Sequence, residues 1–174
     1  MTTSSLHSLS ADDILSRIDE LCDVLENCVQ GGASVSFMLP FGREKSQAFW
    51  QNIAQSVKRG ERLLLVDELE GEGIVGTVQL ILDQPENQPH RADVAKLLVH
   101  DRARRKGVAG RLMNALETAA RANGKSVLVL DTSTGSGAET FYVNAGWEKV
   151  GEIPRYALMP DGEMTSTSVF YKFL

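Results

Sequence analysis

Apolar residues in the first third of the chain recur at spacings of three and four, as on one face of an α-helix. In residues 11–29 this face is formed by Ile14, Ile18, Leu21, Leu25 and Val29. Gly31-Gly32 then ends the predicted helix. A second helix is predicted over 43–58, and the stretch 33–39 between the two is expected to be a loop, since Pro40 follows it. The Ser/Thr-rich residues 1–10 are expected to be disordered.

The pattern then changes to short apolar runs, which are typical of strands. Strands are predicted over 62–68 and 74–82, joined by a glycine-rich turn at 70–73. The run 93–99 does not alternate between apolar and polar positions, which indicates a strand covered on both faces. Residues 126–130 are nearly all apolar and predict a central strand that Asp131 closes.

Between these last two strands lies a helical stripe over 108–122, which Asn123-Gly124 ends. A short helix is predicted over 138–144, followed by strands over 147–153, 156–159 and 166–173. The order contains one β–α–β crossover, so we expect a mixed sheet in an α/β or α+β fold. The 174 residues are expected to form a single domain.

Composition is ordinary for a globular protein, with 43% hydrophobic and 24% charged residues. No apolar run approaches the roughly 20 residues that span a bilayer, and the polar start of the chain is unlike a signal peptide. Cys22 and Cys28 fall on different faces of the first predicted helix, so we expect neither a disulfide nor a metal site. A reduced, cytoplasmic protein is the expectation.

The first candidate for chemistry is the basic turn 104–111, which separates the strand 93–99 from the helix 108–122. The first amides of a helix lack intrahelical partners and, with the helix dipole, attract anions. Gly107 and Gly110 lack a Cβ and allow a phosphate to approach the backbone. Five of the 18 basic residues lie within 102–111, whereas the net charge is −5. A local cationic site on an acidic protein suits a small polyanion better than nucleic acid.

The turn contains the pattern Arg104-x-x-Gly107-x-Ala109, which resembles the acetyl-CoA loop of the GCN5-related N-acetyltransferases. The segments around it agree with that family in order: AKLLVHDRARRKGVAGRLMNALE, then SVLVLDT, then AETFYVNAGWEKVGE. The resemblance implies a twisted, mostly antiparallel mixed sheet with a β–α–β core. It also implies acetyl-CoA as co-substrate and, commonly, a homodimer.

A narrower resemblance is to the tabtoxin resistance protein and its relatives, which acetylate a toxic β-lactam amino acid. The supporting segments are GGASVSFM (31–38), HRADVAKLLV (90–99), LDTSTGSGAETFY (131–142) and PDGEMTSTSVFYK (160–172). Asp93 stands where we expect a glutamate in those proteins, and its side chain is one methylene shorter. This resemblance implies a small amine acceptor.

The family resemblance also implies roles for individual residues. The pantetheine arm would lie along the backbone of Leu98 and Val99 as if it were an added strand. The pyrophosphate would meet the basic turn, whose predicted cofactor-binding residues are Arg104, Arg105, Lys106, Gly107, Val108, Ala109, Gly110 and Arg111.

The position of Tyr142 in the family motif makes it the candidate general acid. A phenol is protonated at neutral pH and can donate to a departing thiolate. Asp131 and Asp93 are the candidates for binding or deprotonating the acceptor amine. Asp131 follows the central strand, and sites in open α/β sheets lie at the carboxyl ends of strands. Direct transfer is expected, because neither cysteine has a histidine near it in sequence.

Other interpretations remain. The acceptor could instead be a polyamine, an aminoglycoside or a protein amino terminus. A non-catalytic acyl-CoA sensor would share the fold, although the presence of Tyr142 and Asp131 argues against it. A dinucleotide-binding protein is disfavoured because the pattern GxGxxG is absent.

Overall fold

The computed structural model describes residues 3–174. In chain order the helices are α1 (Ala11–Ser16), α2 (Ile18–Gln30), α3 (Arg43–Lys58), a 3₁₀ turn (Asp101–Ala103), α4 (Val108–Ala122) and α5 (Gly137–Asn144). The strands are β1 (Ser4–Ser8), β2 (Arg62–Leu69), β3 (Gly73–Ile81), β4 (Arg91–Val99), β5 (Val127–Ser133), β6 (Glu148–Leu158) and β7 (Met164–Phe173).

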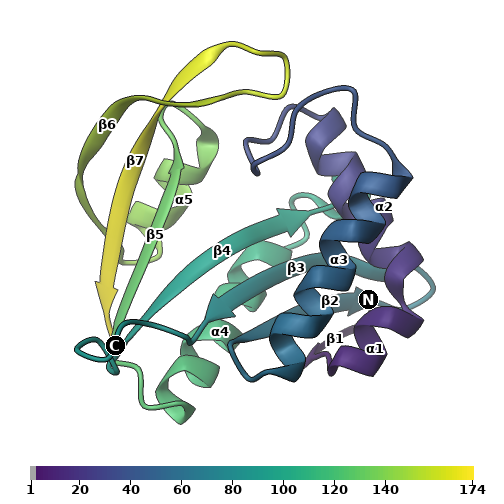
Figure 1. Ribbon diagram of the computed structural model, residues 1–174, viewed down its shortest axis with the longest axis horizontal. Helices are drawn as coiled ribbons and strands as arrows, with labels where there is room; N and C mark the ends of the chain where they lie inside the picture. Colours follow the sequence, from purple (N-terminus) through teal and green to yellow (C-terminus); the bar gives the residue numbers. More distant parts are fainter. Residues whose placement is uncertain (1–2) are drawn as a thin grey trace.

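The seven strands form one sheet in the order β1-β2-β3-β4-β5-β7-β6. Neighbouring strands are antiparallel except for β4 and β5, which run parallel on either side of the crossover helix α4. The predicted mixed, mostly antiparallel sheet with one β–α–β crossover is therefore confirmed. Figure 1 shows α1, α2 and α3 in front of one half of the sheet, with α4 and α5 behind it.

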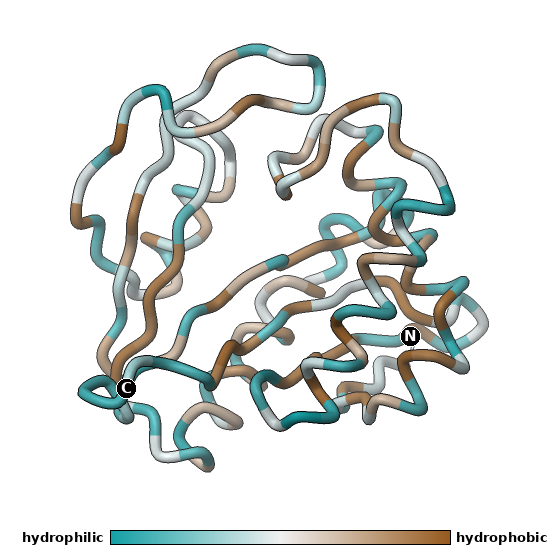
Figure 2. The backbone as a smooth tube through the Cα atoms, in the orientation of Figure 1, coloured by the Kyte–Doolittle hydropathy of each residue, from teal (hydrophilic) through white to brown (hydrophobic). Residues whose placement is uncertain are grey.

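Alternate side chains of the strands enter two hydrophobic layers, one on each face of the sheet. On β2, Leu65 packs in the layer of α4 and α5, whereas Leu64 and Val66 pack in the layer of α1–α3. On β4, Val94 belongs to the first layer and Leu98 to the second. Both faces of β2 and β4 are therefore covered, as the sequence predicts for the strand 93–99, and the apolar positions of Figure 2 follow the same strands and helices.

The predicted disorder of residues 1–10 is wrong for the part that the structure describes, and Met1 and Thr2 lie outside it. Ser4–Ser8 form an edge strand paired antiparallel with β2. The hydroxyl of Ser4 donates to the carboxylate of Asp67 at 2.9 Å. A polar edge strand carries no apolar alternation, so its sequence alone is indistinguishable from a disordered end.

The single helix predicted over 11–29 is two helices, because the backbone of Arg17 leaves the helical conformation. Ser10 starts α1 with a capping box that includes Asp13. The guanidinium of Arg17 binds the carboxylates of Glu20 and Glu68. These ion pairs bind the junction of the two helices to β2.

The two strands predicted over 147–153 and 156–159 are one strand, β6, whose register shifts between Ile153 and Ala157. Arg155 has a φ of 53°, so the irregularity bends the strand without ending it. The strand that Asp131 was expected to close continues to Ser133, because residues 131–133 pair with residues 167–169 of β7.

β4 and β5 are paired over a short stretch only and then diverge, which opens the space of the candidate site. Their parallel pairing covers only residues 91–93 and 127–129, after which the two strands diverge in Figure 1. Beyond Asp93, β4 pairs with β3 alone, and the register of that pair shifts between Thr77 and Gln79. Lys96 lies in the bulge with a φ of 55°.

Candidate active site

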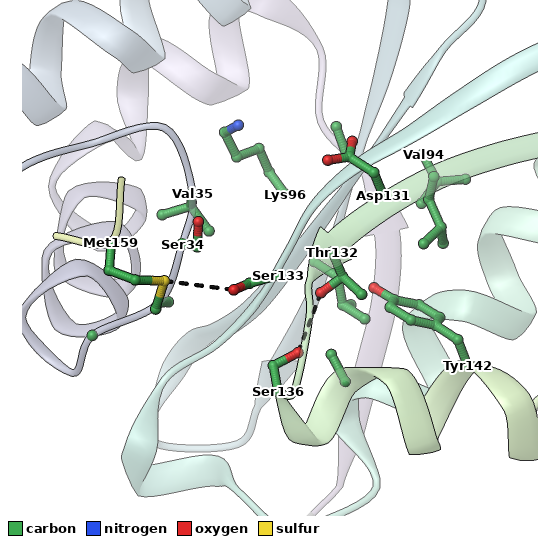
Figure 3. Close-up of a pocket in the computed structure, with 16 residues that line it drawn as sticks. Ser34, Val35, Val94, Lys96, Asp131, Thr132, Ser133, Ser136, Tyr142 and Met159 are labelled. Carbon is green, nitrogen blue, oxygen red and sulfur yellow. Dashed lines mark hydrogen bonds between the residues drawn. The ribbon is translucent and has the colours of Figure 1, made fainter. Parts of the chain in front are cut away.

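A pocket of about 250 Å³ opens where β4 and β5 separate. It is lined by residues 32–35 of the loop before α3, 94–97 of β4, 130–133 of β5, and Ser136, Ala138, Tyr142 and Met159. Figure 3 shows Lys96, Asp131 and Tyr142 extending from three different elements toward this space. Tyr142 and Asp131, two of the three predicted catalytic residues, are thus brought to one pocket.

Tyr142 is both a core residue and a pocket residue. Its ring packs against Phe141, Trp147 and Phe170, with ring centroids 5.4–5.9 Å away, and only 7% of the residue is exposed. Burial, with a smaller contribution from the charge of Asp131, raises the pKa of Tyr142 to about 12. The phenol is therefore a protonated donor at any physiological pH, held in place by its aromatic neighbours.

Asp131 projects from the middle of β5 rather than from its end. Its Oδ2 accepts a hydrogen bond from the hydroxyl of Thr167 on β7 at 2.6 Å. The residue is exposed and lines the main pocket as well as a smaller hollow of about 120 Å³ beneath the β6–β7 hairpin. An ionised carboxylate can accept several further hydrogen bonds, so Asp131 can receive an amine from the pocket.

Asp93 lies on the same face of the sheet as Asp131 but does not line the pocket of Tyr142. Its Oδ1 accepts from Arg91 at 2.5 Å and its Oδ2 from Gln84 at 3.0 Å. It borders a separate shallow hollow that Asp131 also lines. The structure therefore brings two predicted catalytic residues together and gives the third a structural ion pair.

Lys96 lines the pocket and was not singled out from the sequence as a site residue. Its Nζ donates to the hydroxyl of Ser36, in the loop before α3, at 3.0 Å. Burial lowers the pKa of Lys96, while the nearby charge of Asp131 acts in the opposite direction. In the sequence, Lys96 is the one charged residue inside the apolar run 94–99, and this interruption could have identified it as a candidate site residue.

The basic turn has the geometry of an anion site. Gly107 precedes α4 with a left-handed φ of 75°, and no side chain of residues 3–174 caps the helix. Arg111 is the first residue of α4 whose amide bonds back to the turn, to the carbonyl of Gly107 at 3.1 Å. The amides of residues 108–110 therefore meet no capping side chain and are directed outward along the helix axis.

The cations of this turn divide into two groups. Arg111 binds the fully buried carboxylate of Asp67 with Nε at 2.9 Å and Nη2 at 2.7 Å, and Lys106 binds Glu72 at 3.0 Å. Within residues 3–174, Arg104 and Arg105 take part in no ion pair. The side chain of Arg111 therefore shapes the turn, whereas Arg104 and Arg105 keep their charge available to a ligand.

The predicted pantetheine residues Leu98 and Val99 belong to the part of β4 whose second edge has no strand partner among the described residues. On one side they pair with Thr77 and Gly76 of β3, and on the other side the pairing of β4 with β5 ends at Asp93. The thiol of Cys28 contacts the carbonyl of Val99 at 3.5 Å. An unpaired strand edge next to an uncapped helix can receive an extended chain that ends in a phosphate, which is the shape of coenzyme A.

Solved acetyltransferases share this fold. A candidate acetyltransferase from Acinetobacter baylyi ADP1 superposes with a TM-score of 0.82 at 14% identity, covering 100% of this chain and 94% of that one. A candidate acetyltransferase from Salmonella typhimurium, solved with its cofactor acetyl-CoA, superposes with a TM-score of 0.79 at 14% identity, covering 99% and 94%. At such identities the likeness establishes the fold.

Sequence comparison goes further than the fold. Residues 32–147 match the acetyltransferase (GNAT) family. The chain is also 32% identical over 133 residues to an uncharacterized N-acetyltransferase from the hisH-hisA intergenic region of Azospirillum brasilense, covering 75% of this chain and 74% of that protein. The chain belongs to the GNAT family of N-acetyltransferases, which use acetyl-CoA as the acetyl donor.

Three further observations concern other kinds of site. No helix within residues 3–174 is long and apolar enough to cross a membrane. The same residues contain no group of three or more His, Cys, Asp or Glu side chains placed to hold a metal ion. Cys22 and Cys28 are both buried as free thiols.

Proposed function

We propose that the enzyme transfers an acetyl group from acetyl-CoA directly to the primary amine of a small molecule, with a β-lactam amino acid as the candidate acceptor. The observation that carries the proposal is the convergence of Tyr142, Asp131 and the unpaired edge of β4 on one pocket of about 250 Å³. This volume suits a compact molecule. The narrower resemblance of segments such as 131–142 to tabtoxin resistance proteins suggests the β-lactam class.

The donor would be held mainly by backbone. The amides at the start of α4 would bind the pyrophosphate, with Arg104 and Arg105 adding charge, and the edge of β4 at Leu98 and Val99 would pair with the pantetheine arm. A backbone amide of this edge, placed near the thioester carbonyl, would stabilise the developing oxyanion. One such donor is typically worth about 10²–10³ in rate.

Tyr142 would act as the general acid. In the transfer, the acceptor nitrogen forms a bond to the carbonyl carbon, the bond from carbon to sulfur breaks, and the leaving thiolate takes a proton. The phenol of Tyr142 is the proton donor in the pocket, and its pKa of about 12 keeps it protonated. General acid catalysis contributes about 10²–10⁴ in rate.

Asp131 would bind the acceptor ammonium and accept the proton that the amine must lose. Its Oδ2 already accepts from Thr167, so its orientation is set by β7 before an acceptor arrives. Asp93 is a weaker candidate for this role than Asp131, because its carboxylate already accepts hydrogen bonds from Arg91 and Gln84.

Direct transfer is favoured over a covalent cysteine intermediate. Burial raises the pKa of Cys28 to about 11 and also raises that of Cys22, so neither thiol supplies much thiolate at neutral pH. Neither cysteine lines the pocket of Tyr142. A cytoplasmic location and a homodimer stay predictions from the sequence and the family resemblance.

The test is release of coenzyme A thiol from acetyl-CoA with a panel of amines that includes β-lactam amino acids, other amino acids, polyamines, aminoglycosides and a peptide amino terminus. We expect turnover with small amino acids. Turnover only with the peptide or the aminoglycosides would contradict the proposed acceptor class. Binding of acetyl-CoA without turnover for any amine would support a non-catalytic acyl-CoA sensor.

A further inference from the structure

Two unlike charges, Lys96 and Asp131, face the main pocket without neutralising each other. Lys96 projects from the bulge of β4 and Asp131 from β5, and both line the pocket. Among the described residues no ion pair joins them, although the charge of Asp131 influences Lys96. Figure 3 shows both side chains directed into the same space. Their separation leaves room for a group that carries both signs of charge.

The protein partner of each charge is a neutral hydroxyl. Lys96 Nζ donates to Ser36 at 3.0 Å, and Asp131 accepts from Thr167 at 2.6 Å. A hydroxyl satisfies one hydrogen bond of an ammonium that has three donors. Lys96 is partly buried, and burial lowers its pKa, so its remaining donors can be offered to a ligand in the pocket. An anion entering the pocket would be stabilised by this charge.

The backbone directs Lys96 into the pocket at some cost. Its φ of 55° is in the left-handed region, which a residue with a Cβ rarely adopts. The bulge interrupts the regular alternation of β4, between Val94 in one hydrophobic layer and Leu98 in the other. Bulges of this kind re-aim side chains next to active sites.

We infer that Lys96 binds an anionic group of the acceptor, a carboxylate in the simplest case, so that the preferred acceptors are amino acids. The inference rests on the proposed function and deepens it. In an amino acid the amine and the carboxylate are a few bonds apart, so the carboxylate can meet Lys96 while the amine meets Asp131. Ser36 would orient the lysine; it lines the smaller hollow, which Ser34 shares with the main pocket.

The experiment compares amino acids with their carboxamides, which keep the amine and the side chain but lose the negative charge. We expect kcat/KM of the native enzyme to be about 10- to 100-fold higher for an amino acid than for its amide, the range expected of a hydrogen bond between charged groups. In Lys96→Met this preference should fall to nearly one, mainly through a higher KM for the amino acid. Lys96→Arg should restore part of the preference.

Two controls separate binding of the carboxylate from a structural role. Lys58→Met makes the same chemical change at an exposed position at the end of α3 and should leave the preference intact. The increase in melting temperature that acetyl-CoA causes should be the same in Lys96→Met as in the native enzyme. Loss of that increase in Lys96→Met would contradict the inference, because it would assign Lys96 to the donor site or to the fold.

The remaining outcomes distinguish the inference from the proposed function. If the native enzyme acetylates amino acids and their amides equally well, or if Lys96→Met lowers kcat/KM equally for both, the inference is overturned while the proposed function stands. If acetyl-CoA binds but no amine is acetylated, the proposed function fails and the inference fails with it.

Discussion

The basic turn 104–111 and the pocket between β4 and β5 both contain charged side chains, but the two regions use them differently. In the turn, Arg111 and Lys106 are neutralised by Asp67 and Glu72, so much of the charge maintains the shape of the loop. In the pocket, the side chains of Lys96 and Asp131 form hydrogen bonds only with hydroxyls within residues 3–174. The turn presents backbone amides to a ligand, whereas the pocket presents side-chain charges.

This difference fits the two substrates. A donor that is common to a whole family can be bound by backbone amides, which do not depend on the side chains around them as long as glycines allow the turn to form. In our proposal the acceptor would be recognised by side chains that separate elements contribute to the pocket. The predictions below test this division, from the largest expected effect to the smallest.

Gly107→Glu should abolish acetyl-CoA binding. The glutamate would place a negative charge and bulk at the start of α4, at a position with a left-handed φ of 75°. In the native protein, acetyl-CoA at 100 times its Kd should add about 2.7 kcal/mol of stability, or about 5–10 °C in melting temperature. The variant should show no such increase in a thermal shift assay.

Gly124→Glu is the matched control for this variant. It introduces the same charge at a φ of 73°, but at the opposite end of α4, where a Cβ meets nothing within 4 Å. It should keep the response to acetyl-CoA. An equal loss in both variants would show that strain or net charge, rather than the position at the anion site, causes the effect.

Tyr142→Phe should lower kcat about 100-fold or more, the lower end of what general acid catalysis supplies. The ring contacts with Trp147 and Phe170 are retained, so the acetyl-CoA thermal shift should not change. Single-turnover kinetics would measure the chemical step directly. Tyr171→Phe, outside the pocket on β7, is the control; a chemical step as fast in Tyr142→Phe as in this control would remove the acid role.

Arg111→Ala should lower the free energy of unfolding by about 3 kcal/mol, because it leaves the carboxylate of Asp67 buried without a cation. Urea unfolding would measure the change. The double variant Asp67→Asn/Arg111→Ala removes the buried charge as well and should recover part of the loss. A double variant less stable than Arg111→Ala would contradict the structural role assigned to this pair.

Stability above pH 10 should depend on Tyr142. Burial raises its pKa from about 10 in the unfolded chain to about 12, so folding favours the neutral phenol. This contribution is complete below pH 10 and is lost as the pH rises toward 12, by up to about 2.7 kcal/mol. In urea unfolding at pH 8 to 11, the native protein should lose stability more steeply than Tyr142→Phe; parallel curves would contradict the burial of the phenol as the cause of its raised pKa.

The smallest effect is expected within the turn itself. Arg105→Ala should raise the Kd of acetyl-CoA a few-fold, because Arg105 forms no ion pair in the described part of the chain, whereas Lys106→Ala should raise it less, because Glu72 already neutralises Lys106. Calorimetry at low and high salt would measure both values, and the difference should shrink as salt screens the charges. A larger increase in Kd for Lys106→Ala than for Arg105→Ala would contradict the conclusion that Arg105, rather than Lys106, is available to the ligand.

Local patterns account for what could be predicted. The periodicity of α3 and α4, the apolar runs of β2 and β3, and the turn around Gly107 depend on residues close in sequence, so the fold class and the predicted anion-binding turn follow from them. Tyr142 and Asp131 were recognised by motif and by position after a strand, and both line the pocket. The edge strand β1 and the continuous β6 were missed, because long-range pairing rather than local propensity forms them.

By itself, the sequence determined most of the helices and strands and the β–α–β crossover, and it predicted a backbone site for the donor. Only the tertiary structure decided which charged side chains form ion pairs within the protein and which remain available to a ligand. Arg111 meets Asp67, and Lys96 meets Ser36, across separations of 44 and 60 residues that no local pattern encodes. Asp93 is held by Arg91 and Gln84, while Asp131 stays accessible. Charge alone does not distinguish these residues, because burial and the partner brought in by folding decide how each charge is used.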